Sequence, residues 1–178
     1  MPKKSWDRGI PYKQIRERLL MLIDVARHQV SLGYKRARKR LANLYVLLTQ
    51  LDNASRVSEA FEAYLRFVET GEREIEVRVR KQRKDPEFRV VMIPPEVPDP
   101  PDAPRPTSLA AVKVFAQSIG LNTHTLRYAR ITDLAKRQIH PAMIGRITEH
   151  RNLNLLIRYI QKEEARRTLR RLIFGEAG

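Results

Sequence analysis

Proline is concentrated in one short stretch of this chain, and that stretch constrains the fold more than any other feature. Seven of the eleven prolines lie in "PPEVPDPPDAPRP", residues 94–106. Proline fixes φ and has no backbone N–H, so a run of this density cannot be helical. We therefore expect residues 94–106 to form a stiff, extended loop that acts as a spacer.

The stretch before these prolines predicts three helices and a β-hairpin. Apolar side chains at helical spacing mark a first helix over residues 12–30, and the run "LANLYVLL" marks a second, buried one. A third helix follows "DNAS", where Asp52, Asn53 or Ser55 can provide the N-cap. Ile75, Val77 and Val79 then alternate with charged residues, "KQRKDPE" supplies a turn, and "FRVVMI" resumes an extended pattern, which predicts a hairpin over residues 74–93.

The stretch after the prolines predicts helices alone. Thr107 or Ser108 opens the first of them, which ends before Gly120. Thr123 caps a second helix, and Pro141 suits the first turn of a third. The predicted fold class is therefore mainly α with a small antiparallel β-hairpin, an α+β fold.

The charge of the chain favours a polyanionic partner. Thirty-five Lys and Arg against twenty Asp and Glu give a formal net charge of +15, spread along the sequence. Nucleic acid is the first candidate, and an anionic membrane surface is the second. A membrane surface normally needs a strongly amphipathic helix with exposed apolar side chains, and the sequence contains none that stands alone.

The composition also excludes several kinds of site. There is no cysteine, which rules out disulfides, thiolate metal sites and cysteine nucleophiles. The apolar runs are far shorter than the roughly 20 residues that cross a membrane. "MPKKSWDRGI" at the amino terminus lacks the apolar segment of a secretory signal. We expect a soluble, cytoplasmic protein with no membrane association.

Tyr159 lies in the last predicted helix, which begins near Asn152, and it is turned away from the apolar stripe of that helix. At 100° per residue it lies roughly 110° from the centre of the stripe. That stripe is formed by Leu153, Leu156, Ile157 and Ile160.

A set of polar residues recurs at defined distances from this tyrosine. His124 and Arg127 are three residues apart, on one face of the predicted helix and near its amino end, where free backbone N–H groups favour an anion. His150 follows Arg127 by twenty-three residues, and Tyr159 follows His150 by nine. Arg56 precedes them all, at the start of a helix that leads into the hairpin.

These residues resemble the pattern of the tyrosine recombinase (phage integrase) family. Arg56 in "SRVSEA" resembles the first arginine of that family's G-L-R-x-S-E-L, and "HTLR" matches its H-x-x-R. His150 in "TEHRN" matches the second histidine of L-G-H, and Tyr159 in "IRYI" matches the nucleophile. The resemblance extends from about residue 12 to the end and corresponds to the family's catalytic domain.

Two glycines of the family pattern are absent from this chain. "NAS" replaces the glycine before the first arginine, and Glu149 replaces the glycine before the second histidine. Both positions adjoin residues of the pattern, and Glu149 brings a negative charge to that region. They indicate a divergent branch of the family or one with weakened activity.

The resemblance implies DNA cleavage and rejoining through a covalent 3′-phosphotyrosine. Tyr159 is then the nucleophile, and Arg56 and Arg127 hold the phosphate. A hairpin lysine is the general acid: we prefer Lys84, with Lys81 as the alternative. His124 and His150 assist by hydrogen bonding or proton transfer. Neither a metal nor another cofactor is expected.

The resemblance also implies an assembly on double-stranded DNA. We expect residues 1–178 to be a single catalytic domain without an amino-terminal core-binding domain, weakly associated or monomeric alone and tetrameric on DNA. The tail, residues 165–178, is a candidate for exchange between protomers. The predicted contacts to the DNA backbone are Lys35, Arg36, Arg38, Lys39, Arg40, Lys81, Arg83 and Arg130.

Three other functions remain open from the sequence. A type IB topoisomerase-like enzyme uses the same chemistry without strand exchange. A noncatalytic DNA-binding protein on a decayed recombinase scaffold fits the charge of Glu149. A basic helix-turn-helix regulator would use the helix pair over residues 107–138. Arginine richness and the lack of cysteine fit a thermophilic archaeal source. Integration of a virus or plasmid is the expected role, because the resemblance to the chromosome-resolving members of the family is poor outside the catalytic residues.

Overall fold

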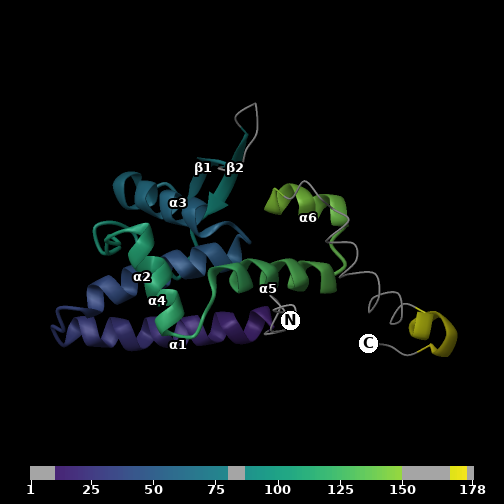
Figure 1. Ribbon diagram of the computed structural model, residues 1–178, viewed down its shortest axis with the longest axis horizontal. Helices are drawn as coiled ribbons and strands as arrows, with labels where there is room; N and C mark the ends of the chain where they lie inside the picture. Colours follow the sequence, from purple (N-terminus) through teal and green to yellow (C-terminus); the bar gives the residue numbers. More distant parts are fainter. Residues whose placement is uncertain (1–10, 80–86, 150–168, 176–178) are drawn as a thin grey trace, which may run out of the picture. The chain divides into compact units, whose positions relative to one another are not determined.

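The computed structural model describes residues 11–79, 87–149 and 169–175, and the chain divides into two compact units, residues 1–130 and 131–178 (Figure 1). The fold is mainly helical with one two-stranded antiparallel sheet, which confirms the predicted α+β class. The elements are α1 (Tyr12–Ser31), α2 (Ala37–Asp52), α3 (Val57–Thr70), β1 (Glu74–Arg78), β2 (Phe88–Met92), α4 (Leu109–Ser118), α5 (Thr123–Lys136) and α6 (Pro141–Thr148).

Helix α2 is the centre of the first unit, where it packs against α1, α3 and α4. Every residue from Leu41 to Leu51 is buried, because the apolar run of this helix leaves it no polar face. Helix α1 contributes only a stripe to the same core, as its apolar spacing predicts. That stripe consists of Ile15, Leu19, Ile23 and Ala26.

The hairpin packs its inner face against α3. Glu74 pairs with Met92 and Arg78 with Phe88, and burial alternates strictly along both strands. The inner face carries Ile75, Val77 and Val91, with one charged residue, Arg89, among them. The hairpin is thus where the sequence predicts it, with the apolar residues of β1 inward, whereas Phe88, Val90 and Met92 of β2 are exposed.

The proline-rich segment is not the extended spacer that its composition predicts. It folds back onto the first unit, burying Val97 and Ala103. Its carbonyl groups accept hydrogen bonds from side chains of the core: Tyr64 donates to Pro104 (2.9 Å), and Arg73 donates to Pro94 and Val97. A segment with so few backbone N–H groups can pair only some of its carbonyls internally, as the Val97 N–H does with Pro94 and the Asp102 N–H with Asp99, so arginine and tyrosine side chains supply further donors that hold it in place.

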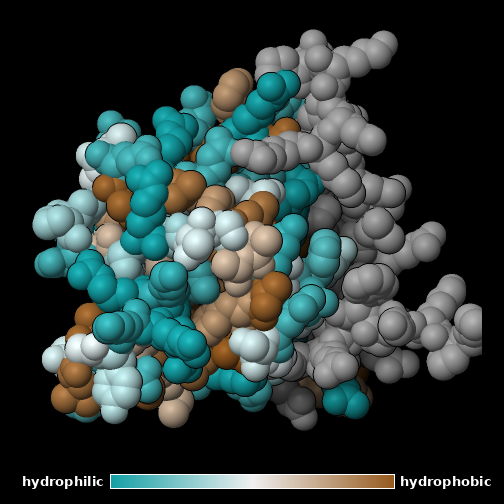
Figure 2. All heavy atoms as spheres, turned by 60° about the vertical axis from the view of Figure 1, so that its left-hand side comes forward, coloured by the Kyte–Doolittle hydropathy of each residue, from teal (hydrophilic) through white to brown (hydrophobic). Residues whose placement is uncertain are grey.

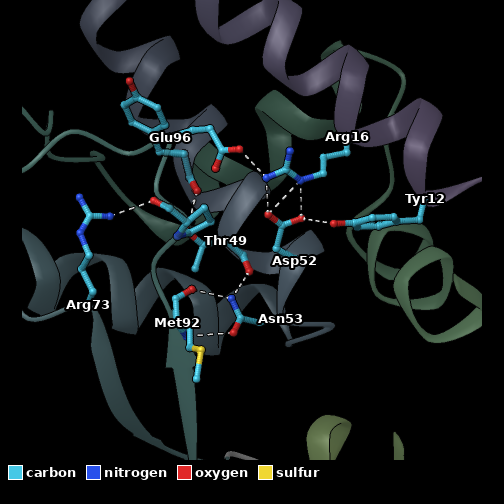
Figure 3. A network of polar contacts seen from close by, with 10 residues as sticks. Tyr12, Arg16, Thr49, Asp52, Asn53, Arg73, Met92 and Glu96 are labelled. Carbon is cyan, nitrogen blue, oxygen red and sulfur yellow. Dashed lines mark hydrogen bonds and ion pairs between the residues drawn. The ribbon is translucent and has the colours of Figure 1, made fainter. Parts of the chain in front are cut away.

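A group of polar side chains, the Asp52 cluster (Tyr12, Arg16, Asp52 and Glu96), ties this loop and α1 to the end of α2 (Figure 3). The Tyr12 hydroxyl donates to Asp52 Oδ1 at 2.8 Å, and Arg16 Nε donates to both Asp52 oxygens at 3.1 and 3.2 Å. Arg16 Nη2 also reaches Glu96 Oε1 at 2.5 Å. One guanidinium therefore bridges two carboxylates from separate segments of the chain.

In the second unit, α6 begins as predicted, with Pro141 in its first turn. The preceding residue, His140, is the N-cap, and its ring accepts from the Ala142 N–H at 3.3 Å. Residues 169–174 are also helical. Within the described ranges, no helix is both long enough and apolar enough to cross a membrane.

Candidate functional site

Arg56 occupies the N-cap position of α3, where the sequence predicts Asp52, Asn53 or Ser55. A guanidinium has no acceptor, so the capping role passes to Glu59 in the first turn. Its carboxylate accepts from the Arg56 backbone N–H at 2.9 Å and from the Arg56 guanidinium at 2.7 Å. Asp52 and Asn53 instead bond to neighbouring elements, and the prediction of their capping role is wrong.

A second arginine, Arg89 of β2, contacts the same carboxylate. Its Nη1 lies 3.5 Å from Glu59 Oε2, and its Nη2 donates to the Asn53 carbonyl at 2.8 Å. Arg89 is 6% exposed and Glu59 is fully buried. Neither residue was predicted from the sequence, although an arginine at an inward position of a strand is a signal that the sequence contains.

The start of α5 is held beside the turn that precedes Arg56. The side-chain amide of Gln50, buried in α2, donates to the Thr123 carbonyl at 2.7 Å and to the Ser55 carbonyl at 3.4 Å. The helix begins at Thr123 itself, so the predicted Thr123 cap is wrong. The Asn122 side chain accepts from the His124 N–H instead, at 2.8 Å.

This arrangement brings Arg127 of α5 close to Arg56 and Arg89. Arg127 is 6% exposed, and its pKa is lowered to about 10. Burial is the main cause, the positive charge of Arg56 adds to it, Glu59 opposes it, and Arg89 lowers the pKa further. At neutral pH Arg127 remains protonated. We call Arg56, Glu59, Arg89 and Arg127 the arginine cluster.

The other predicted catalytic residues divide between exposed and undescribed positions. His124 is exposed near the start of α5, although it is three residues from the buried Arg127. Tyr128, the next residue after Arg127, is 42% exposed. The residues that lie outside the described ranges are Lys81, Arg83, Lys84, His150 and Tyr159. The structure thus brings together the two predicted phosphate-binding arginines, and the roles of the rest stay predictions.

The two missing glycines of the family pattern fall at positions with left-handed backbone. Ala54, in the "NAS" segment, has φ +48°, and Glu149 at the end of α6 has φ +53°. Glycine adopts this conformation freely, whereas other residues do so at a cost. Ala54 and Glu149 therefore adopt the backbone conformation that glycine favours, although neither residue adopts it as easily as glycine does.

Most of the predicted DNA contacts within the described ranges lie at the amino end of α2. The α1–α2 connection is at the left of Figure 1, the side that comes forward in Figure 2, where hydrophilic side chains predominate. We call its five exposed cations the basic patch: Lys35, Arg36, Arg38, Lys39 and Arg40. Arg130 lies elsewhere, with its guanidinium carbon 4.4 Å from the centre of the Tyr12 ring.

Two known proteins are similar to this chain over most of its length. One carries the name "Putative integrase ORF241" and comes from Acidianus two-tailed virus; it is 31% identical over 177 residues, covering 96% of this chain and 70% of the viral protein. The other is "Uncharacterized protein MJ0770" of Methanocaldococcus jannaschii, 30% identical over 200 residues, 94% of this chain and 89% of that protein. No family model and no solved structure matches the chain.

Proposed function

The chain belongs to the family of the Acidianus two-tailed virus protein named "Putative integrase ORF241", and on that basis we propose that it is a site-specific DNA recombinase of the integrase type. It cleaves one DNA strand by forming a covalent bond between Tyr159 and a 3′ phosphate, then rejoins the strands without a metal ion. The arginine cluster is the observation that carries this proposal.

The cluster suits a phosphodiester because it concentrates guanidinium groups around a single buried carboxylate. Arg56 and Arg89 both bind Glu59, and Arg127 is buried close to them. The guanidinium groups of Arg56 and Arg127 would form paired, charge-assisted hydrogen bonds with phosphate oxygens and stabilise the charge added as the phosphorus becomes pentacoordinate, while Arg89 holds Glu59. Burial is the main cause of the lowered pKa of Arg127, and a bound phosphate would offset the repulsion from Arg56 and Arg89 that adds to it.

In the proposed reaction the Tyr159 oxygen forms a bond to phosphorus as the bond from phosphorus to the 5′ oxygen breaks. The phenolic proton passes to one of the histidines of the site or to water, and Lys84 or Lys81 supplies a proton to the 5′ oxygen. His124 and His150 hydrogen-bond the phosphate or assist these transfers. The phosphotyrosine preserves a reactive ester, so a 5′ hydroxyl of another strand can reverse the step.

The basic patch would bind the same duplex away from the cleavage point. It lies at the amino end of α2, whereas Arg56 follows the carboxyl end. A helix of 16 residues is about 24 Å long, the length of roughly seven base pairs. Contacts to phosphates at that distance orient the DNA without reading its sequence. Assembly into a tetramer on DNA, with exchange of residues 165–178, is part of the same proposal.

The test is to capture the covalent intermediate. The protein is incubated with end-labelled suicide substrates and with supercoiled plasmid, at low salt and with a chelator, and is then run on a denaturing gel. We expect an adduct with the wild type and none with Tyr159→Phe. Tyr128→Phe is the matched control, because it removes another tyrosine hydroxyl from an exposed position on α5.

The remaining outcomes separate the alternatives. Relaxation of the plasmid without strand exchange would favour a type IB topoisomerase-like enzyme. Wild-type protein that binds DNA but forms no adduct would overturn the proposal and leave a noncatalytic DNA-binding protein. An adduct that persists in Tyr159→Phe and disappears in Tyr128→Phe would show that Tyr128 is the nucleophile and that the role proposed for Tyr159 is wrong.

A further inference from the structure

The residue that connects the hairpin to the arginine cluster is Arg89. Its guanidinium contacts two points of the segment that carries Arg56: the Asn53 carbonyl before it and the Glu59 carboxylate after it. Its side chain is 4% exposed, so it is enclosed by protein. The planar fork of a guanidinium lets one side chain hold both points in a fixed relation.

Strand β2 makes a second attachment to the same turn. The Asn53 side chain donates to the Met92 carbonyl at 2.7 Å, and it accepts from the Met92 N–H at 2.8 Å (Figure 3). The turn contains Ala54 at φ +48°, a conformation that alanine holds only when its surroundings impose it. The bonds between the Asn53 side chain and Met92, and the bond from Arg89 to the Asn53 carbonyl, together provide such surroundings.

Glu59 transmits this restraint to Arg56. One carboxylate oxygen accepts from the Arg56 guanidinium, and the other accepts from the Arg56 backbone N–H and faces Arg89. The Arg56 side chain is still 28% exposed, so without Glu59 its guanidinium could turn into solvent. A carboxylate fixed from the strand side therefore fixes the direction of Arg56.

We propose that Arg89 is a positioning residue for Arg56: it acts through Glu59 and the Asn53 carbonyl, and it makes the orientation of the phosphate-binding arginine depend on strand β2. This inference deepens the proposed function, since it concerns the same phosphate site. Arg89 itself lies behind Glu59 and is not required to touch DNA.

The first experiment separates positioning from DNA binding. In single-turnover assays on suicide substrate, Arg89→Met should slow adduct formation about 100-fold, the cost of a displacement of about 1 Å at a reacting centre. The dissociation constant for duplex DNA should not change. Arg89→Lys should restore part of the rate, because lysine can reach one of the two acceptors but not both. Equal losses of binding and rate would overturn the inference.

A double-substitution cycle tests the route through Glu59. Glu59→Gln should slow adduct formation. In the Glu59→Gln background, Arg89→Met should slow the reaction by a much smaller factor than in the wild-type background. Independent, additive losses would contradict an action through Glu59. Arg73→Met is the control for general destabilisation, since Arg73 binds the proline-rich loop and not the cluster.

A measurement that needs no catalysis keeps this inference distinct from the proposed function. The side-chain Nε–H signal of Arg56 is assigned by its loss in Arg56→Lys, and its order is measured by ¹⁵N relaxation in the full chain. We expect an ordered guanidinium in the wild type and in Arg73→Met, and a mobile one in Arg89→Met. If the wild type forms no adduct, the proposed function fails while this result still decides the role of Arg89. An Arg56 signal that stays ordered in Arg89→Met overturns the inference.

Discussion

Two groups of arginines and carboxylates lie at the two ends of the short turn between α2 and α3. Carboxylates outnumber arginines in one group, and arginines outnumber carboxylates in the other. In the Asp52 cluster, one guanidinium, Arg16, bridges Asp52 and Glu96. In the arginine cluster, one carboxylate, Glu59, is shared by Arg56 and Arg89, with Arg127 close by.

The pKa shifts of the two clusters follow this difference. Burial acts to lower the pKa of Arg16, but the hydrogen bonds to Asp52 and Glu96 outweigh it and raise the pKa above its usual range. Burial also lowers the pKa of Arg127, and there the neighbouring cations Arg56 and Arg89 add to the effect. The shift in the Asp52 cluster fits a role in stability of the fold, and the shift of Arg127 fits the phosphate binding that we propose for Arg56 and Arg127.

The largest effect that separates the clusters is expected from Arg127→Met. Adduct formation should fall about 100- to 1,000-fold, as when one charge-stabilising donor is removed from an active site. The free energy of unfolding should fall less than in Arg56→Met, because burial and the cations Arg56 and Arg89 oppose the charge that the substitution removes, although Glu59 favours it. Urea denaturation and the single-turnover assay measure the two quantities.

Arg56→Met is the matched variant for that experiment. It should lose activity to a similar degree, but it should also destabilise the fold, because it removes the guanidinium 2.7 Å from the buried Glu59. Loss of stability in Arg127→Met as large as in Arg56→Met would show that Arg127 is a structural residue like the arginine of the Asp52 cluster.

In the Asp52 cluster, Asp52→Ala is expected to reduce stability and leave the rate of adduct formation unchanged. The substitution leaves Tyr12 and Arg16 without their shared acceptor, and it should lower the free energy of unfolding by about 2 to 3 kcal/mol. The rate of adduct formation should be unchanged at temperatures where the variant is folded. Asp99→Ala is the control, since it removes a largely exposed ion pair with Arg73 and should cost less than about 1 kcal/mol.

The smallest effect is expected in the alkaline range, from Tyr12. Burial and then the hydrogen bond and negative charge of Asp52 raise the pKa of Tyr12 to about 12, from a usual value of 10.0. The folded state thus keeps the proton that the unfolded chain loses, so this contribution is complete below pH 10 and is lost as pH rises toward 12.

Urea denaturation between pH 9 and 11.5 tests this contribution. Tyr12→Phe should lower stability by about 1 kcal/mol at neutral pH and should make the alkaline decline less steep. Tyr45 and Tyr64, whose pKa values burial also raises, add to the decline in both proteins. Identical pH profiles for the two proteins would mean that the Asp52 cluster does not hold Tyr12 in solution.

Much of the fold was predictable because its signals are local. The stripe of α1, the apolar run of α2, the alternation of the hairpin and the proline at the start of α6 each lie within one element. The proline-rich loop was mispredicted for the opposite reason. Its composition excludes a helix, but the donors that fold it back, Tyr64 and Arg73, lie in distant segments.

The candidate site, too, has features that could be predicted from local sequence and features that could not. The sequence by itself determined the spacing of Arg56, His124, Arg127, His150 and Tyr159, and with it the prediction that two arginines share one phosphate. Tertiary structure alone decided that Glu59 and Arg89 complete the cluster and that Gln50 joins the start of α5 to the turn before Arg56. The spacing between residues can be read along the sequence. Burial and the sharing of a carboxylate arise only when separate elements pack together.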